Sequence, residues 1–181
     1  MMHRLIKVGT EPLIQLLDLI HKLPRPAYVT TTPSFQQPIG RHVRHTLDLY
    51  RAIEQGDHSG VVDYDVRSRG SALESNPQEA ERKIARIMSW LSGLSSSQLH
   101  SPVRVKTEVS IHESESVWLE SNLARELCYV GSHTIHHLAY MSLLARLQGI
   151  EIDAGIGVAP ATVSYYRSID MSKGRLDVGS C

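Results

Sequence analysis

Four stretches of the chain repeat apolar residues at helical spacing, with polar residues at the positions between them. The first runs from about Thr10 to Leu23, with Thr10 as the expected N-cap and Pro12 in the first turn. Its apolar stripe consists of Leu13, Leu16, Leu17, Ile20 and Leu23. The Pro- and Thr-rich stretch that follows cannot be helical, so it predicts a connection that ends at Pro38.

The other three stretches also predict helices. The second covers about residues 38–55, the third 76–94 and the fourth 121–148. Gly56 and Gly149 follow the second and fourth stretches and are typical helix ends. Cys128 lies inside the fourth helical pattern, so we expect its thiol to pack in the core.

The remaining segments predict connections and one hairpin. Residues 56–75 carry charges and glycines and are expected to form a surface connection. Apolar and polar residues alternate in 103–111 and in 116–121, which predicts a short β-hairpin. Residues 150–168 show little periodicity and are expected to wrap over one end of the helices. The sequence thus predicts an all-α four-helix bundle with a short β-hairpin before the last helix, forming one domain over residues 1–168, and a disordered C-terminal tail over 169–181.

Charge and composition narrow the class of protein. Lys+Arg and Asp+Glu both number 19, so the chain has no net basic field to hold a phosphate backbone, and nucleic acid is not expected as a partner. No apolar run reaches the length that spans a bilayer, so no membrane partner is expected either. With only Cys128 and Cys181, the chain predicts no disulfide framework and fits a reducing cytoplasm.

The candidate chemistry lies in the histidines of the fourth helical stretch. His133 and His137 stand four residues apart, which places both imidazoles on one helix face where they can ligate one metal ion. Thr134 stands where the helical zinc-protease motif has its glutamate, which argues against a metalloprotease. A third ligand could come from His42 or His45 on the second helical stretch.

Glu126 precedes His133 by two helical turns on the same face. It could accept a hydrogen bond from a ligating histidine, supply a fourth ligand or shuttle a proton. The alternative is that the histidines are hydrogen-bonded core residues without a metal. Burying several imidazoles without partners is costly, and one metal ion would remove that cost.

At these residues the chain resembles the DinB-like superfamily. The motifs are "IGRHVRHTLDLY" at 39–50, "RELCYVGSHTIHHLAYM" at 125–141 and "GVAPAT" at 157–162, in that order. The resemblance implies a four-helix bundle with an up-down-down-up course and a divalent metal held by three histidines. Those histidines would be His45, His133 and His137. His42 is then an extra histidine, which either lines the pocket or takes the ligand role of His45.

The resemblance also implies a function, because characterised relatives include metal-dependent transferases of low-molecular-weight thiols. The leading prediction is a metal-dependent thiol S-transferase or hydrolase with a small-molecule substrate, for which a low-molecular-weight thiol is one candidate. Zinc is the expected metal, although three imidazoles also suit nickel, iron or manganese. His42 and Glu126 are the acid–base candidates.

Two features remain open at this stage. Arg67 and Arg69 could bind a substrate carboxylate, but a solvated loop or a contact in a homodimer fits them equally well. The alternative to an enzyme is a metal-binding bundle that senses or stores an ion, or that uses the ion structurally. A closed site with Glu126 or His42 as the fourth ligand would favour this alternative.

Overall fold

The computed structural model describes residues 2–31 and 36–176 of the chain. The helices are α1 (Met2–Lys22), α2 (Arg25–Val29), α3 (Ile39–Ser59), α4 (Pro77–Gly93), α5 (Ser96–Leu99), α6 (Leu123–Leu147) and α7 (Pro160–Leu176), with a short 3-10 helix, η1 (Ala72–Glu74). The strands are β1 (Val61–Asp63), β2 (Pro102–Glu108) and β3 (Ser116–Asn122). Within this part of the chain, no helix is long and apolar enough to cross a membrane.

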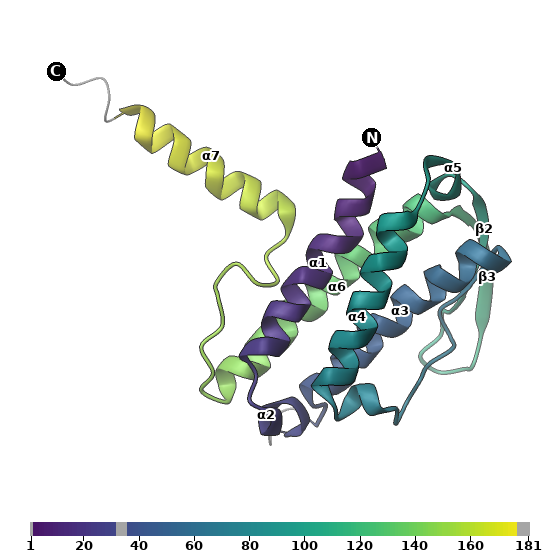
Figure 1. The fold of residues 1–181 in the computed structure, drawn as a ribbon, viewed down its shortest axis with the longest axis horizontal. Helices are drawn as coiled ribbons and strands as arrows, with labels where there is room; N and C mark the ends of the chain where they lie inside the picture. Colours follow the sequence, from purple (N-terminus) through teal and green to yellow (C-terminus); the bar gives the residue numbers. More distant parts are fainter. Residues whose placement is uncertain (1, 32–35, 177–181) are drawn as a thin grey trace.

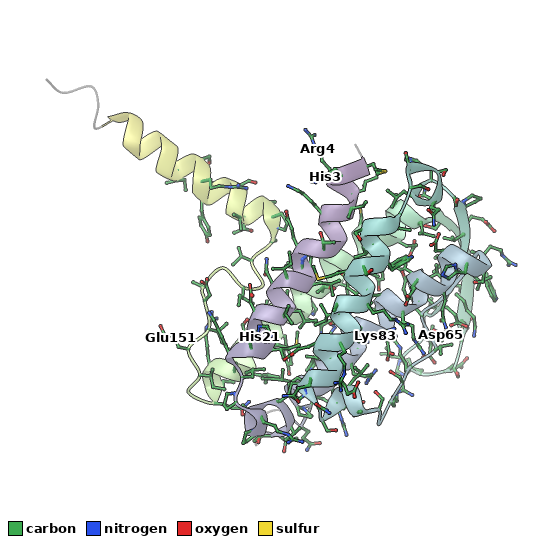
Figure 2. The ribbon with its side chains drawn as sticks, in the orientation of Figure 1. His3, Arg4, His21, Asp65, Lys83 and Glu151 are labelled. Carbon is green, nitrogen blue, oxygen red and sulfur yellow. The ribbon has the colours of Figure 1, made fainter. Side chains whose placement is uncertain are left out.

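Four of the long helices, α1, α3, α4 and α6, pack together and enclose the core (Figure 1). α1 and α3 each contact both α4 and α6. Their apolar stripes supply the largest fully buried side chains, which include Leu13, Leu16, Leu47, Ile53, Ile84 and Leu91. Side chains fill the space among these helices, whereas His3 and His21 lie at the two ends of α1 (Figure 2). Burial of these stripes is the main source of stability expected for this arrangement.

A three-stranded mixed sheet lies beside the helices, and it makes the predicted all-α fold class wrong. The strand order is β1-β2-β3, with β1 parallel to β2 and β2 antiparallel to β3. The predicted hairpin is present as β2 and β3. α3 ends at Gly60, whose φ of 74° is in the left-handed region, and the chain then continues into β1. β1 has only three residues, too few for an alternating pattern to reveal it in the sequence.

The start of α1 also differs from the sequence-based prediction. The helix begins at Met2, so Thr10 lies inside it and is not its N-cap. The Thr10 hydroxyl donates to the carbonyl oxygen of Ile6 at 3.2 Å instead. Leu5 and Ile6 pack against the core and extend the apolar stripe toward the N-terminus.

The segment after α6 returns along the helices before α7 begins. Ile152 and Ile156 are buried, and the Gly157 amide donates to the Gln15 side chain at 3.0 Å. α7 was not predicted, and it projects away from the other helices (Figure 1). The predicted disordered tail, 169–181, begins within α7, and its residues 177–181 lie outside the described part of the chain.

Candidate metal centre

Two packed helices bring together the three histidines that the resemblance selects. His45 lies in the first half of α3, and His133 and His137 lie near the middle of α6. The side chain of Asn122 caps α6 by accepting a hydrogen bond from the Arg125 amide at 3.0 Å. Because α3 packs against α6, the histidine of one helix faces the pair on the other.

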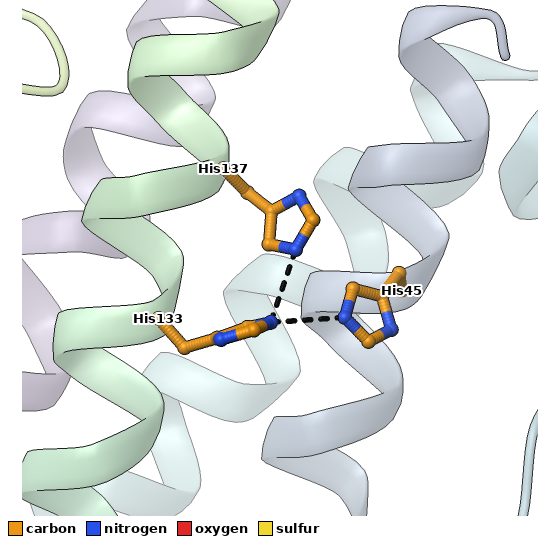
Figure 3. A group of neighbouring side chains, drawn as sticks. All are labelled: His45, His133 and His137. Carbon is orange, nitrogen blue, oxygen red and sulfur yellow. Dashed lines mark hydrogen bonds between the residues drawn. The ribbon is translucent and has the colours of Figure 1, made fainter. Parts of the chain in front are cut away.

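The three Nε2 atoms converge on one point (Figure 3). His133 Nε2 lies 3.0 Å from His45 Nε2 and 3.0 Å from His137 Nε2. The potential ligand atoms of the three residues all lie within 4.8 Å of one another, so the three histidines lie close enough to hold a metal ion. Zinc–nitrogen bonds of about 2.0–2.1 Å place tetrahedral ligands roughly 3.4 Å apart, so a small relaxation of the rings would fit a metal.

The surroundings keep these imidazoles neutral, which is the form that binds metals. Burial lowers the pKa of His45 to about 4, with a further contribution from the Arg67 guanidinium. Burial likewise lowers the pKa of His137 to about 3, helped by the neighbouring histidine rings. The pKa of His133 is also lowered, mainly by burial. All three rings are only partly buried, so the centre remains reachable from solvent.

His42 lies beside the centre but does not belong to the converging group. Its Nδ1 lies 3.2 Å from His137 Nδ1, on the side of that ring away from His133. Its Nε2 is buried, and among the described residues it has no hydrogen-bond partner. His136, by contrast, is exposed. His42 Nδ1 is therefore placed to accept a hydrogen bond from His137 Nδ1, and metal-binding histidines usually have such an acceptor beside the ring nitrogen that does not face the metal.

Arg67 reaches the centre from the loop between β1 and η1. Its Nη1 lies 2.8 Å from His45 Nδ1. Asp48 anchors this loop on α3, because its carboxylate accepts hydrogen bonds from the Ser68 amide at 3.0 Å and the Ser68 hydroxyl at 2.6 Å. Arg44 donates to the same carboxylate at 3.1 Å. The loop that was expected to be a surface connection thus contributes a residue to the candidate centre.

Glu126 lies in a second polar cluster, at the start of α6. Its buried carboxylate accepts hydrogen bonds from Tyr64 at 2.7 Å, Ser121 at 2.5 Å and Arg125 at 3.3 Å. Burial and the Glu126 charge raise the pKa of Tyr64, so its hydroxyl stays protonated. The structure therefore does not bring Glu126 into the converging group of His45, His133 and His137.

A cavity of about 340 Å³ adjoins this second cluster, between α6 and the sheet. Tyr129 lines the cavity, and its ring centroid lies 5.8 Å from that of His133. The other lining residues are Tyr64, Val105, Thr107, Leu119, Glu120, Ser121, Arg125 and Glu126. Tyr64 and Tyr129 are site residues that the sequence analysis missed. Tyr129 stands one turn before His133, a spacing that could have drawn attention to it.

Cys128 contradicts the expectation of a core thiol. It is exposed and lines a groove between α1 and α6 with residues such as Val8 and Ile135. The apolar period of α6 places it at the border of the buried stripe, where the sequence alone does not decide its burial.

Comparison of the chain with protein families finds no match, and comparison with curated proteins finds none either.

Proposed function

We propose that this protein is a metal-dependent enzyme in which His45, His133 and His137 hold one divalent transition metal ion. The observation that carries the proposal is the convergence of their three Nε2 atoms from two separate helices. Three neutral imidazoles suit zinc first, and nickel, iron or manganese as well. A set of three protein ligands is typical of catalytic zinc, whereas structural zinc usually has four.

The metal would act as a Lewis acid that lowers the pKa of a thiol or a water molecule reaching it. The protein supplies the rest of the chemistry. His42 orients His137 through the contact between their Nδ1 atoms, and Tyr129 forms a wall shared by the cavity and the histidines. The resemblance to the DinB-like superfamily supports a thiol S-transferase or a hydrolase that acts on a small molecule.

A non-enzymatic metal-binding protein is the second candidate, and a fourth protein ligand would favour it. Glu126 is a poor fourth ligand, because Tyr64, Ser121 and Arg125 already occupy its carboxylate. His42 would have to turn away from His137 to reach the point where the Nε2 atoms converge. These contacts favour a centre with three protein ligands.

Metal content of the purified, untagged protein tests the proposal. We expect about one transition-metal ion per chain, and its loss in His45→Ala and in His133→Ala. His136→Ala is the matched control, because His136 is an exposed histidine on the same helix and should leave the metal content unchanged. Thiol-transfer and hydrolysis assays on the loaded protein then separate an enzyme from a metal-storage protein. A protein that takes up no zinc, nickel or iron would contradict the proposal.

A further inference from the structure

The guanidinium of Arg67 is a partly buried cation beside a candidate cation site. Its Nη1 lies 2.8 Å from His45 Nδ1, and it forms no ion pair with a carboxylate of the described residues. The Arg67 side chain is partly buried, so its charge is less well solvated than on the open surface. A partly buried guanidinium without an ion pair is unfavourable, and an anionic partner would stabilise it.

Asp48 and Asp65 are the acidic residues whose charges act on Arg67, and both are engaged elsewhere. The Asp48 carboxylate accepts from Arg44 at 3.1 Å and from the Ser68 hydroxyl at 2.6 Å. Asp65, on the sheet side of the molecule in Figure 2, accepts from the Ser116 hydroxyl at 2.7 Å and from the Glu108 amide at 2.7 Å. Neither carboxylate is free to neutralise Arg67 without breaking these bonds.

The contact between Arg67 and His45 is also incompatible with a metal on His45. A guanidinium can only donate, so His45 Nδ1 must accept, and the proton of a neutral ring then sits on Nε2. Nε2 is the atom that faces His133 and would bind the metal. A neutral imidazole that gives Nε2 to a metal carries its proton on Nδ1, where Arg67 could no longer donate.

A metal at the three histidines would also leave the centre with unbalanced positive charge. Three neutral imidazoles leave the full charge of a divalent ion in place, and Arg67 adds another positive charge next to it. Glu126 cannot compensate, because its carboxylate is held by Tyr64 and Ser121. An incoming ligand with a negative group would balance the centre, and a guanidinium pairs with a carboxylate through two parallel hydrogen bonds.

We propose that metal binding releases Arg67 from His45 and that the freed guanidinium binds a carboxylate of the substrate. The centre therefore takes small molecules that carry a carboxylate group. This inference rests on the proposed function, because it requires a metal at the three histidines.

Zinc affinity, measured by competition with a chelator, tests the release step. In Arg67→Met the competing hydrogen bond and the nearby positive charge are gone, so we expect zinc to bind about tenfold more tightly than in the wild type. Arg69→Met is the matched control, an exposed arginine of the same loop, and should stay within about twofold. Unchanged or weaker zinc binding in Arg67→Met would overturn the inference.

Acetate is the probe for the carboxylate site, titrated into the cobalt-loaded protein while the visible absorption of the metal is followed. We expect acetate to change the spectrum of the wild type and to bind about tenfold more weakly to Arg67→Met. Arg67→Lys keeps the charge but cannot form the two paired hydrogen bonds, so its acetate affinity should also fall. This variant replaces Arg67→Met in the experiment if Arg67→Met does not fold. Equal acetate binding in the wild type and in these variants would overturn the inference.

The two proposals fail in different ways. A wild-type protein that binds no metal overturns the proposed function and this inference together. A wild-type protein that binds metal, with Arg67 variants that behave identically to it, overturns this inference alone.

Discussion

Two polar clusters lie on the same helix, α6, and their hydrogen bonds differ in kind. At the start of the helix, the Glu126 carboxylate meets donors from Tyr64 and Ser121. Two turns later, nitrogen faces nitrogen, with His133 Nε2 at 3.0 Å from both His45 Nε2 and His137 Nε2. In the first cluster, protein groups donate the hydrogen bonds that the carboxylate accepts. The second cluster would be stabilised most by a cation at its centre.

This difference separates a stabilising cluster from a ligand-binding one. The buried Glu126 carboxylate, whose oxygens accept hydrogen bonds from Tyr64 and Ser121, holds the sheet to α6, since Tyr64 follows β1 and Ser121 lies in β3. Converging imidazoles with lowered pKa values instead bring three Nε2 atoms to one point, and a bound metal ion would stabilise that arrangement. Substitutions in the Glu126 cluster should therefore lower the free energy of unfolding, whereas substitutions in the histidine cluster should lower the zinc affinity.

The largest expected effect is on stabilisation by zinc. Zinc at about 1,000 times its dissociation constant should raise the free energy of unfolding of the wild type by about 4 kcal/mol. His137→Ala removes one of the three converging nitrogens and should abolish this rise. Chemical denaturation with and without zinc measures it, with His136→Ala as the control that keeps the full rise. Equal stabilisation of His137→Ala and the wild type would contradict the metal site.

Glu126→Gln should show the opposite pattern. The amide cannot accept the bonds of Tyr64 and Ser121 equally well, so we expect a loss of about 2 kcal/mol in the free energy of unfolding. Zinc affinity should stay within about twofold, because the carboxylate has no contact with the converging nitrogens. Glu120→Gln, at an exposed position on β3, is the control and should leave both quantities unchanged. A large loss of zinc affinity in Glu126→Gln would make Glu126 part of the metal centre.

A smaller effect is expected from His42. His42→Phe keeps a ring in place but removes the acceptor beside His137 Nδ1, so zinc affinity should fall about tenfold. The fall expected for His137→Ala is much larger, which distinguishes an orienting neighbour from a ligand. Chelator competition measures both. If His42→Phe lost zinc as completely as His137→Ala, His42 would be a ligand.

The sequence predicts those parts of the centre whose residues lie close together along the chain. The spacing of His133 and His137 predicts their shared helix face, because both lie on one continuous helix. The choice between His42 and His45 needed the packing of α3 on α6, since residues three apart lie near the same face.

Contacts across long sequence separations could not be predicted in the same way. Tyr64 meets Glu126 only because β1 joins the sheet, and β1 is too short to leave a pattern. The direction of Arg67 depends on the loop that Asp48 anchors through Ser68. Such contacts between loop and helix are set by tertiary packing rather than by periodicity.

The smallest effect is the pH dependence of the metal-free protein. The pKa of His45 is lowered to about 4 and that of His137 to about 3, from 6.5 in the unfolded chain. Below pH 6.5 the unfolded chain therefore binds protons that the folded protein does not, and stability should fall as the pH drops from 6.5 toward 4. We expect a loss of about 1 kcal/mol or more, after allowing for solvent screening of these partly exposed rings.

Urea denaturation at several pH values in this range measures the effect, with a chelator present throughout. His137→Phe removes one of the titrating rings, so its stability should fall less steeply with decreasing pH than that of the wild type. His112→Phe is the control, because His112 is an exposed histidine in the turn between β2 and β3, away from the cluster, and its replacement should keep the wild-type slope. In a parallel series with zinc in place of the chelator, the metal should hold the rings in their neutral form, so the loss of stability should begin at lower pH. If the wild-type stability stayed constant from pH 6.5 to 4, the hydrogen-bonding groups of the histidine cluster would be satisfied within the protein, as those of the Glu126 cluster are, and the cluster would not need a metal.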